Sequence, residues 1–137
     1  MYTSLIWARA ARGGWGPRPA FVLRRVRREG VCELPGGGRG IGRAVATALS
    51  DDGWSIVVCG RTRATLDETV DSLTGAGLAV VADVSKFNDV EHLFDATIER
   101  FGRIDLLFNN AGITAPPVPI DELEVEAWDR LMAVNVR

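Results

Sequence analysis

A glycine-rich run at residues 36–42 has the residue types and spacing best suited to chemistry. It reads Gly-Gly-Gly-Arg-Gly-Ile-Gly and stands directly before a helical pattern. Glycine lets a backbone approach a pyrophosphate where a Cβ atom would collide, and free N–H groups at the start of a helix attract negative charge. A dinucleotide diphosphate is therefore expected against Gly36, Gly40, Ile41 and Gly42, with an ordinary glycine-rich turn as the alternative.

The residues after the next strand bear on which dinucleotide is bound. An apolar run ends at Cys59 and is followed by Gly60 and Arg61, about 20 residues after the glycines, where a dinucleotide fold contacts the ribose. A fold that selects NAD usually has Asp or Glu here. This chain has Arg61 instead, and Arg39 lies within the glycine run. Two guanidiniums without a carboxylate favour a 2′-phosphate, hence NADP(H) over NAD(H); the alternative is that both are solvated surface charges.

Composition and charge restrict the other partners. The 137 residues suffice for one compact domain. Seven arginines and no acids occur in residues 1–28, whereas the remainder has 18 acids against nine bases. The excess of acids after residue 28 does not suit binding to nucleic acid, whose phosphates need a basic surface. No apolar run reaches the ~18 residues of a membrane span. Cys32 and Cys59 lack metal-ligand spacing, so we expect no metal site, a reducing compartment and a cytoplasmic location.

Helical patterns and short apolar runs alternate from residue 36 onward. Such apolar runs mark strands that are buried on both faces, and the alternation is typical of a parallel sheet. The sequence therefore predicts an α/β fold, a Rossmann-like doubly wound sheet that is truncated to three or four strands with flanking helices. Inward-facing positions are expected to include Ile41, Ile98 and Trp128. The expected helices are Ile41–Asp52, Thr65–Thr74, a third from a cap at Ser85 to Gly102 and a fourth from Glu124, and the expected strands are Ser55–Gly60, Leu78–Ala82 and Ile104–Phe108.

Four motifs occur in an order and spacing that resemble those of the classical short-chain dehydrogenase/reductases. The resemblance covers roughly residues 36–137 and implies an oxidoreductase that acts on alcohol or carbonyl groups with a dinucleotide as its partner. The motifs are the glycines Gly36, Gly40 and Gly42, the pair Asp83-Val84, the run Asn109-Asn110-Ala111-Gly112, and the pair Asn135-Val136.

The resemblance also implies roles for single residues. Asp83, beside Val84, would hydrogen-bond the adenine, although a carboxylate at a helix entry near Ser85 is the alternative. The segment Asn110, Ala111 and Gly112 would stabilise the sheet and lie along the cofactor. Asn135 would belong to the catalytic tetrad and help to hold a water that relays protons.

The start of the matching region departs from the family pattern. The family's first strand is apolar and central, but here it reads Val31-Cys32-Glu33-Leu34-Pro35. A buried carboxylate must shift its pKa or disrupt the strand, and proline is rare in central strands. We therefore expect a damaged first strand and a family pattern that begins abruptly at Gly36.

The Arg-rich segment 1–30 shows no sustained period and is expected to be irregular and not native to the partial NAD(P)-binding domain of residues 31–137. A disordered basic tail, a transit-like peptide and translation from a misplaced gene start are the three interpretations of this segment.

The catalytic residues of the family are only partly present. The family requires a Ser and a Tyr-x-x-x-Lys, whereas this chain has one tyrosine, Tyr2, and one lysine, Lys86. We therefore expect Asn135 to be vestigial and the chain to be inactive on its own, since a carbonyl that receives hydride needs a proton donor. A homo-oligomer is expected only of a full-length parent. A non-catalytic nucleotide-binding or interaction module and a non-functional gene fragment are the alternatives.

Overall fold

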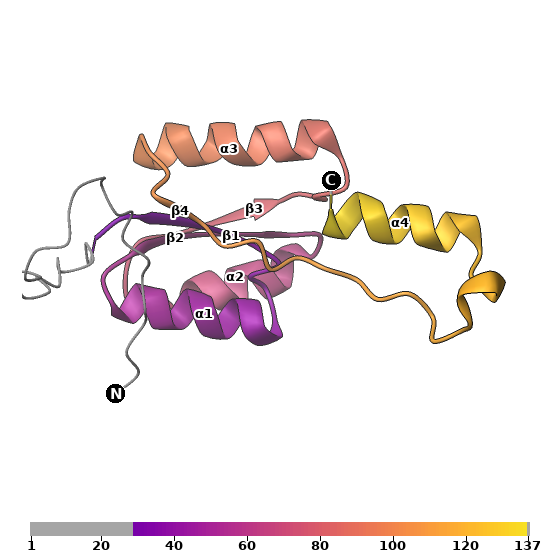
Figure 1. Ribbon diagram of the computed structural model, residues 1–137. Coiled ribbons are helices and arrows are strands. Elements are labelled where there is room, and N and C mark those ends of the chain that lie inside the picture. Colours follow the sequence, from indigo (N-terminus) through magenta and orange to yellow (C-terminus); the bar gives the residue numbers. More distant parts are fainter. Residues whose placement is uncertain (1–28, 137) are drawn as a thin grey trace, which may run out of the picture.

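The computed structural model describes residues 29–136, which form a parallel four-stranded sheet with helices on both faces (Figure 1). The strand order is β3-β2-β1-β4, so β1 lies inside the sheet. Apart from residues 29 and 30, the Arg-rich segment 1–30 lies outside the described residues, and the expectations for it stay predictions. The elements are β1 (Val31–Pro35), α1 (Gly40–Asp51), β2 (Ser55–Gly60), α2 (Arg63–Asp71), β3 (Gly77–Val81), α3 (Phe87–Phe101), β4 (Leu106–Leu107), the 3-10 helix η1 (Ile120–Glu122) and α4 (Val125–Asn135).

Two apolar clusters cover the two faces of the sheet, because side chains alternate along each strand. Helices α1 and α2 cover one face and α3 covers the other (Figure 1). The predicted doubly wound α/β architecture is therefore confirmed. The first cluster is Cys32, Leu34, Ala46, Ile56, Val58 and Leu66, and the second is Val31, Val57, Cys59, Val80, Ala82 and Leu93.

The first strand is intact, which corrects the prediction that it is damaged. All five residues of Val31–Pro35 are buried, and the strand pairs with β2 on one side and with β4 on the other. The prediction that the family pattern begins only at Gly36 is therefore wrong. The reason is that the fold accommodates both Glu33 and Pro35, each by a local arrangement of neighbouring groups.

Glu33 is fully buried and is accommodated by a hydroxyl on α3. Its Oε1 lies 2.6 Å from Thr97 Oγ1, which is also 2.8 Å from Leu93 O. The Thr97 hydroxyl donates to Glu33 Oε1, and because it has a single proton it shares that proton between Glu33 and Leu93 O. Burial raises the pKa of Glu33, against the lowering effect of the Thr97 hydrogen bond. Burial thus favours the neutral form of Glu33, and Oε2 has no hydrogen-bond partner among residues 29–136.

Pro35 is accommodated by its place at the end of the strand. Hydrogen bonding alternates along β1, with Gly36 N donating to Cys59 O of β2 and Phe108 N donating to Glu33 O. The missing N–H of Pro35 therefore falls on the β4 side, where β4 has already ended at Leu107. The ladder between β1 and β2 loses no donor.

Three residues expected to face inward are exposed. The exposed fraction is 74% for Ile41, 49% for Ile98 and 46% for Trp128. In α1 the small residues Gly42 and Ala46 face the sheet, which lets the helix lie close to the strands. In α3, Thr97 takes the inner position beneath Glu33.

Helix α4 lies beyond the carboxyl ends of the strands, not on a face of the sheet (Figure 1), and has no buried residue. The prediction that Ser85 caps α3 is also wrong, because α3 begins at Phe87 and its N-cap residue is Lys86.

The part of the chain that the structure describes contains no helix long and apolar enough to cross a bilayer. Within residues 29–136, no three His, Cys, Asp or Glu side chains gather in a way that could hold a metal ion. Cys32 and Cys59 are free and buried in neighbouring strands. Burial raises their thiol pKa to about 11 and about 12, so both are small protonated core residues, as predicted for Cys59.

Candidate functional site

A cleft of about 520 Å³ opens at the carboxyl ends of the strands. In a parallel α/β sheet this edge is where ligands bind. Seven of the predicted cofactor residues line it: Gly36, Arg39, Arg61, Asp83, Val84, Ala111 and Gly112.

The glycine loop connects β1 to α1 at this edge. Gly36 has a φ of +76°, and its N–H donates to Cys59 O of β2 at 2.8 Å. A Cβ on Gly42 would collide with Gly36 O and lie 2.7 Å from Asn110 Nδ2. The glycines therefore allow the loop to fold tightly against its neighbours, and this packing brings the start of α1 to the cleft.

The amino-terminal end of α1 is suited to an anion. Its first turn has no acidic residue, and the side chain of the N-cap residue Arg39 makes no capping hydrogen bond. The first N–H groups of a helix have no partner within the helix, and the helix dipole adds positive potential there. A diphosphate would fit this end, as the glycine spacing predicts.

Asn110 fixes the glycine loop to the end of β4. Its Nδ2 donates to Pro35 O and Gly36 O, each at 3.3 Å. A Cβ on Gly36 would lie 2.9 Å from this nitrogen. Asn110 does not line the cleft, so the structure places it behind the predicted cofactor site, where it supports the loop.

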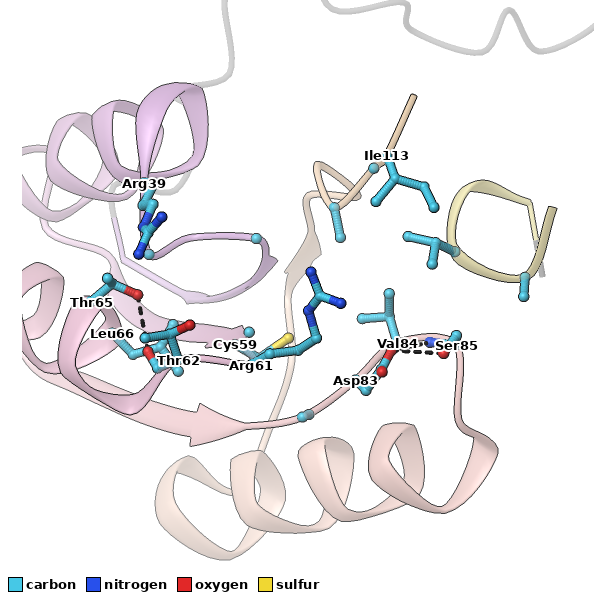
Figure 2. Close-up of a pocket in the computed structure, with 18 of the residues that line it drawn as sticks. Arg39, Cys59, Arg61, Thr62, Thr65, Leu66, Asp83, Val84, Ser85 and Ile113 are labelled. Carbon is cyan, nitrogen blue, oxygen red and sulfur yellow. Dashed lines mark hydrogen bonds between the residues drawn. The ribbon is translucent and has the colours of Figure 1, made fainter. Parts of the chain in front are cut away.

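Positive charge predominates among the residues that line the cleft. Arg39, Arg61 and Arg130 line it, and Asp83 is the one carboxylate among its described lining residues. Arg61 extends from the end of β2 into the cleft, between the glycine loop and the turn at Asp83–Ser85 (Figure 2). The chain as a whole is acidic, so this local excess of guanidinium groups suits an anionic ligand.

Asp83 takes part in a turn after β3. Its Oδ1 accepts hydrogen bonds from Ser85 Oγ at 2.7 Å and from Ser85 N at 3.1 Å. The pKa of Asp83 is lowered below its usual value, chiefly by the hydrogen bond from the Ser85 hydroxyl and then by the bond from the Ser85 backbone N–H. The nearby Arg61 and Lys86 lower it further, whereas some desolvation opposes the shift. Asp83 is therefore ionised at neutral pH. Ser85, which the sequence led us to expect as the cap of α3, hydrogen-bonds Asp83 instead.

Asn135 makes two reciprocal hydrogen bonds to the backbone of Ile113. Its Oδ1 accepts from Ile113 N and its Nδ2 donates to Ile113 O, both at 2.9 Å. The side chain thus joins the end of α4 to the segment after β4. Its part in catalysis stays a prediction.

Some predicted cofactor residues do not line the cleft, and some lining residues were not predicted. Gly40, Ile41, Gly42 and Asn110 do not line the cleft, because they belong to the helix start or lie behind the loop. The lining residues that the sequence did not single out include Gly38, Thr62, Thr65, Ser85, Ile113, Arg130, Ala133 and Val134. Gly38, Thr62 and Ser85 adjoin the motifs and could have been found from that signal, whereas Arg130 depends on where α4 lies.

Comparison with known proteins agrees with the fold and the cleft. A sequence model of the short chain dehydrogenase family matches residues 33–137. The chain belongs to this family. The match begins within β1, which again corrects the expectation that the pattern starts at Gly36. The chain has the Rossmann fold of the family's N-terminal half, as the four motifs predicted.

Curated relatives and solved structures extend this result. The chain is 36% identical over 108 residues to the short chain dehydrogenase/reductase dpfgG of Gibberella zeae, which covers 77% of this chain and 40% of that protein. The dehydrogenase/reductase SDR family member 4 of Caenorhabditis elegans is 37% identical over 72% of this chain and 40% of its own length. A 3-ketoacyl-(acyl-carrier-protein) reductase from Brucella melitensis, complexed with NADH, superposes with a TM-score of 0.75 at 36% identity, over 78% of this chain and 44% of that one. The chain thus spans about two fifths of the length of these curated relatives.

Proposed function

We propose that the cleft binds NADP(H) in preference to NAD(H) and that the chain supplies the cofactor-binding part of an oxidoreductase acting on alcohol or carbonyl groups. The observation that carries this proposal is the charge of the cleft where β2 ends. Gly60 stands where a ribose-binding carboxylate would be expected, and Arg61 extends into the cleft beside it. A guanidinium there forms charge-assisted hydrogen bonds with a 2′-phosphate, which are stronger than any bond that it could make to a neutral 2′-hydroxyl.

Each part of the dinucleotide has a matching group in the cleft. The diphosphate would lie at the glycine loop, where Gly36, Gly38 and Arg39 line the cleft just before α1 begins. The 2′-phosphate would lie near Arg39 and Arg61, and the adenine near the ionised Asp83 and Val84. Ala111 and Gly112 would follow the cofactor toward α4, where Arg130 lines the cleft.

The preference for NADP(H) rests on this chain and not on its relatives. The Brucella melitensis reductase is described with NADH, and a xylitol dehydrogenase with 30% identity and a TM-score of 0.75 is described with NAD+. Both of these relatives are described with the non-phosphorylated dinucleotide, so they do not carry the preference proposed for this chain. The residues after β2 are the feature of this chain that favours the phosphorylated form.

We further propose that these 137 residues do not turn over a substrate by themselves. The bound cofactor supplies hydride transfer, and this chain's residues would bind and orient it. Tyr2 and Lys86 are the only residues of their types, so the Tyr-x-x-x-Lys pair that the family uses to deliver a proton cannot be formed from them. Loss of general acid catalysis removes about 10²–10⁴-fold of rate.

Titration of the purified chain with NADPH and NADH, followed by nucleotide fluorescence, tests the proposal. We expect tighter binding of NADPH, and we expect Arg61→Met to weaken NADPH binding about 10- to 100-fold while leaving NADH binding unchanged, since a hydrogen bond to a charged group contributes about 1.5–3 kcal/mol. Arg103→Met is the matched control, because Arg103 pairs with Asp105 away from the cleft. Equal affinity for both nucleotides would contradict the preference, and turnover of a carbonyl compound by this chain would contradict the proposed inactivity.

A further inference from the structure

Arg43 of α1 joins the glycine loop to the first turns of α2. Its Nη2 lies 2.9 Å from Gly38 O and 3.2 Å from Thr65 O, and its Nε donates to Thr69 Oγ1 at 3.0 Å. Nη2 also lies 2.9 Å from Glu68 Oε2. Arg43 does not line the cleft, so these contacts hold the loop from behind.

Thr69 completes this arrangement from α2. It is fully buried, and its Oγ1 lies 3.2 Å from Gly37 O and 3.0 Å from Thr65 O. Two successive carbonyls of the glycine loop are therefore bound by side chains of the flanking helices. Thr69 contacts the carbonyl of Gly37, and Arg43 contacts the carbonyl of Gly38.

The direction of these carbonyls determines the direction of the next N–H groups. In a planar trans peptide the C=O and the following N–H point in opposite directions, and the described residues contain no cis peptide bond. The N–H groups of Gly38 and Arg39 therefore point away from Thr69 and Arg43. Both residues line the cleft, and within residues 29–136 neither N–H donates to an acceptor in the chain.

We infer that Arg43 is a positioning residue for the dinucleotide diphosphate. By binding Gly38 O, it turns a carbonyl dipole away from the cleft and presents the adjacent N–H to the phosphate. Without this contact the peptide can rotate and bring a partial negative charge toward the anion. This inference rests on the proposed function and adds to it a residue outside the cleft.

The position of Arg43 predicts which nucleotides should respond. The diphosphate is common to NADPH and NADH, so loss of Arg43 should weaken both by the same factor. Loss of Arg61, in contrast, should weaken NADPH alone. This difference separates a residue that orients the loop from one that attracts the 2′-phosphate by its charge.

Titrations with NADPH and NADH of Arg43→Met and Arg43→Lys test this inference, with Arg63→Met as the control. We expect Arg43→Met to weaken the binding of both nucleotides about 10- to 100-fold, the scale of a charged hydrogen bond. Arg43→Lys should be intermediate, because one ammonium cannot reproduce a planar fork that contacts the loop and Thr69 together. Arg63 carries the same charge but is 65% exposed and pairs with Asp67 on α2, so Arg63→Met should bind like the wild type.

Hydrogen exchange of the nucleotide-free protein provides a second readout. The amides of Gly37 and residue 43 donate to Leu34 O and Arg39 O, and we expect both to exchange faster in Arg43→Met while β3 and α3 keep wild-type rates. Unchanged nucleotide affinity, a fall for NADPH alone, or unchanged exchange at these two amides would overturn the inference. If the wild type bound neither nucleotide, the proposed function would fail, and the exchange rates would still decide whether Arg43 holds the loop.

Discussion

The two walls of the cleft differ in how they are held. One wall consists of the glycine loop and the end of β2, and it stands on strands and helices with fully buried side chains on both faces of the sheet. The other wall includes Ile113 and the last turn of α4, a helix without a buried residue. Within that wall, two hydrogen bonds between Asn135 and Ile113 join α4 to the segment that follows β4.

This difference teaches that the two ends of a bound dinucleotide would meet walls of unequal stability. Burial of apolar surface is the main source of folding free energy, and segments that bury little open locally at low free energy. The wall at the glycine loop, where we propose that the adenosine end binds, therefore rests on packing within the chain and needs no ligand to form. The wall at α4 depends on few contacts within the described residues, and substitutions should affect the two walls very differently.

The largest effect is expected from truncation of a core side chain beneath the first wall. Leu93 is buried on α3 against the sheet, and Leu93→Ala should lower the free energy of unfolding by about 2–5 kcal/mol, because it removes apolar contacts and leaves a cavity. Urea denaturation followed by circular dichroism measures this change. A loss below about 1 kcal/mol would break the comparison, since it would mean that the sheet is no better packed than α4.

A substitution at Glu33 should increase the free energy of unfolding and so widen the difference in stability between the sheet and α4. Burying a polar group without a hydrogen-bond partner costs about 1–3 kcal/mol, and Oε2 of Glu33 has no partner among the described residues, so we expect Glu33→Leu to stabilise the chain at pH 8. The pKa of Glu33 is raised in the folded chain, so the folded state binds the proton more tightly than the unfolded state. The contribution of Glu33 is therefore most favourable below its ordinary pKa of 4.5 and falls as the pH rises toward the folded pKa.

Thermal melts of the wild type and Glu33→Gln across this pH range test the sign of the effect. The glutamine side chain of the variant does not titrate, so the wild type should lose stability relative to the variant as the pH rises above 4.5. The opposite slope, or parallel curves for the two proteins, would show that the fold does not raise the pKa of Glu33.

A smaller loss of stability, with a clear loss of binding, is expected from Gly42→Ala. The added Cβ would collide with Gly36 O, and overpacking of this kind costs about 1–3 kcal/mol. Because the collision displaces the glycine loop, NADPH titration should also show weaker binding. Gly75→Ala is the matched control, since its Cβ would come no closer than 3.4 Å to another atom, Ser50 Oγ. Equal NADPH affinity in the two variants would contradict the role assigned to the loop.

The smallest effect is expected in the second wall. Trp128 is the largest side chain of α4 and is 46% exposed, so Trp128→Ala should change the free energy of unfolding by about 0.5 kcal/mol or less, as is usual for surface positions. The same urea denaturation measures it. A loss comparable to that of Leu93→Ala would show that α4 is as firmly packed as α3 and would remove the contrast between the walls.

Much of the first wall could be predicted from local sequence patterns. The apolar run at Ile56–Cys59 predicts a buried parallel strand, and the glycines before Ile41 predict both the turn and the helix start. Gly102 ends α3 in a left-handed conformation, as its position after the helical pattern predicts. These features depend on neighbours in the sequence, so the sequence is sufficient to locate them.

The errors arose where a residue's environment is made by distant parts of the chain. Glu33 was expected to damage β1, but Thr97 lies 64 residues away and supplies its hydrogen-bond partner. Trp128 follows an inward helical period, yet α4 lies beyond the carboxyl ends of the strands (Figure 1), and the side chain is 46% exposed among the described residues. Periodicity indicates which residues share a face of a helix, but it does not indicate whether another element packs against that face.

The sequence by itself determined the family, the order of strands and helices, and the motifs that meet at the carboxyl edge of the sheet. Only the tertiary structure decided that β1 tolerates an acid, that Arg130 joins Arg39 and Arg61 in one cleft, and that Arg43 holds the glycine loop from behind. The physical reason is that motifs are local in sequence, whereas hydrogen-bond partners and burial are set by segments brought together on folding. Arg43 carries no motif, and its role follows from contacts with Gly38, Thr65 and Thr69 that exist only in the folded chain.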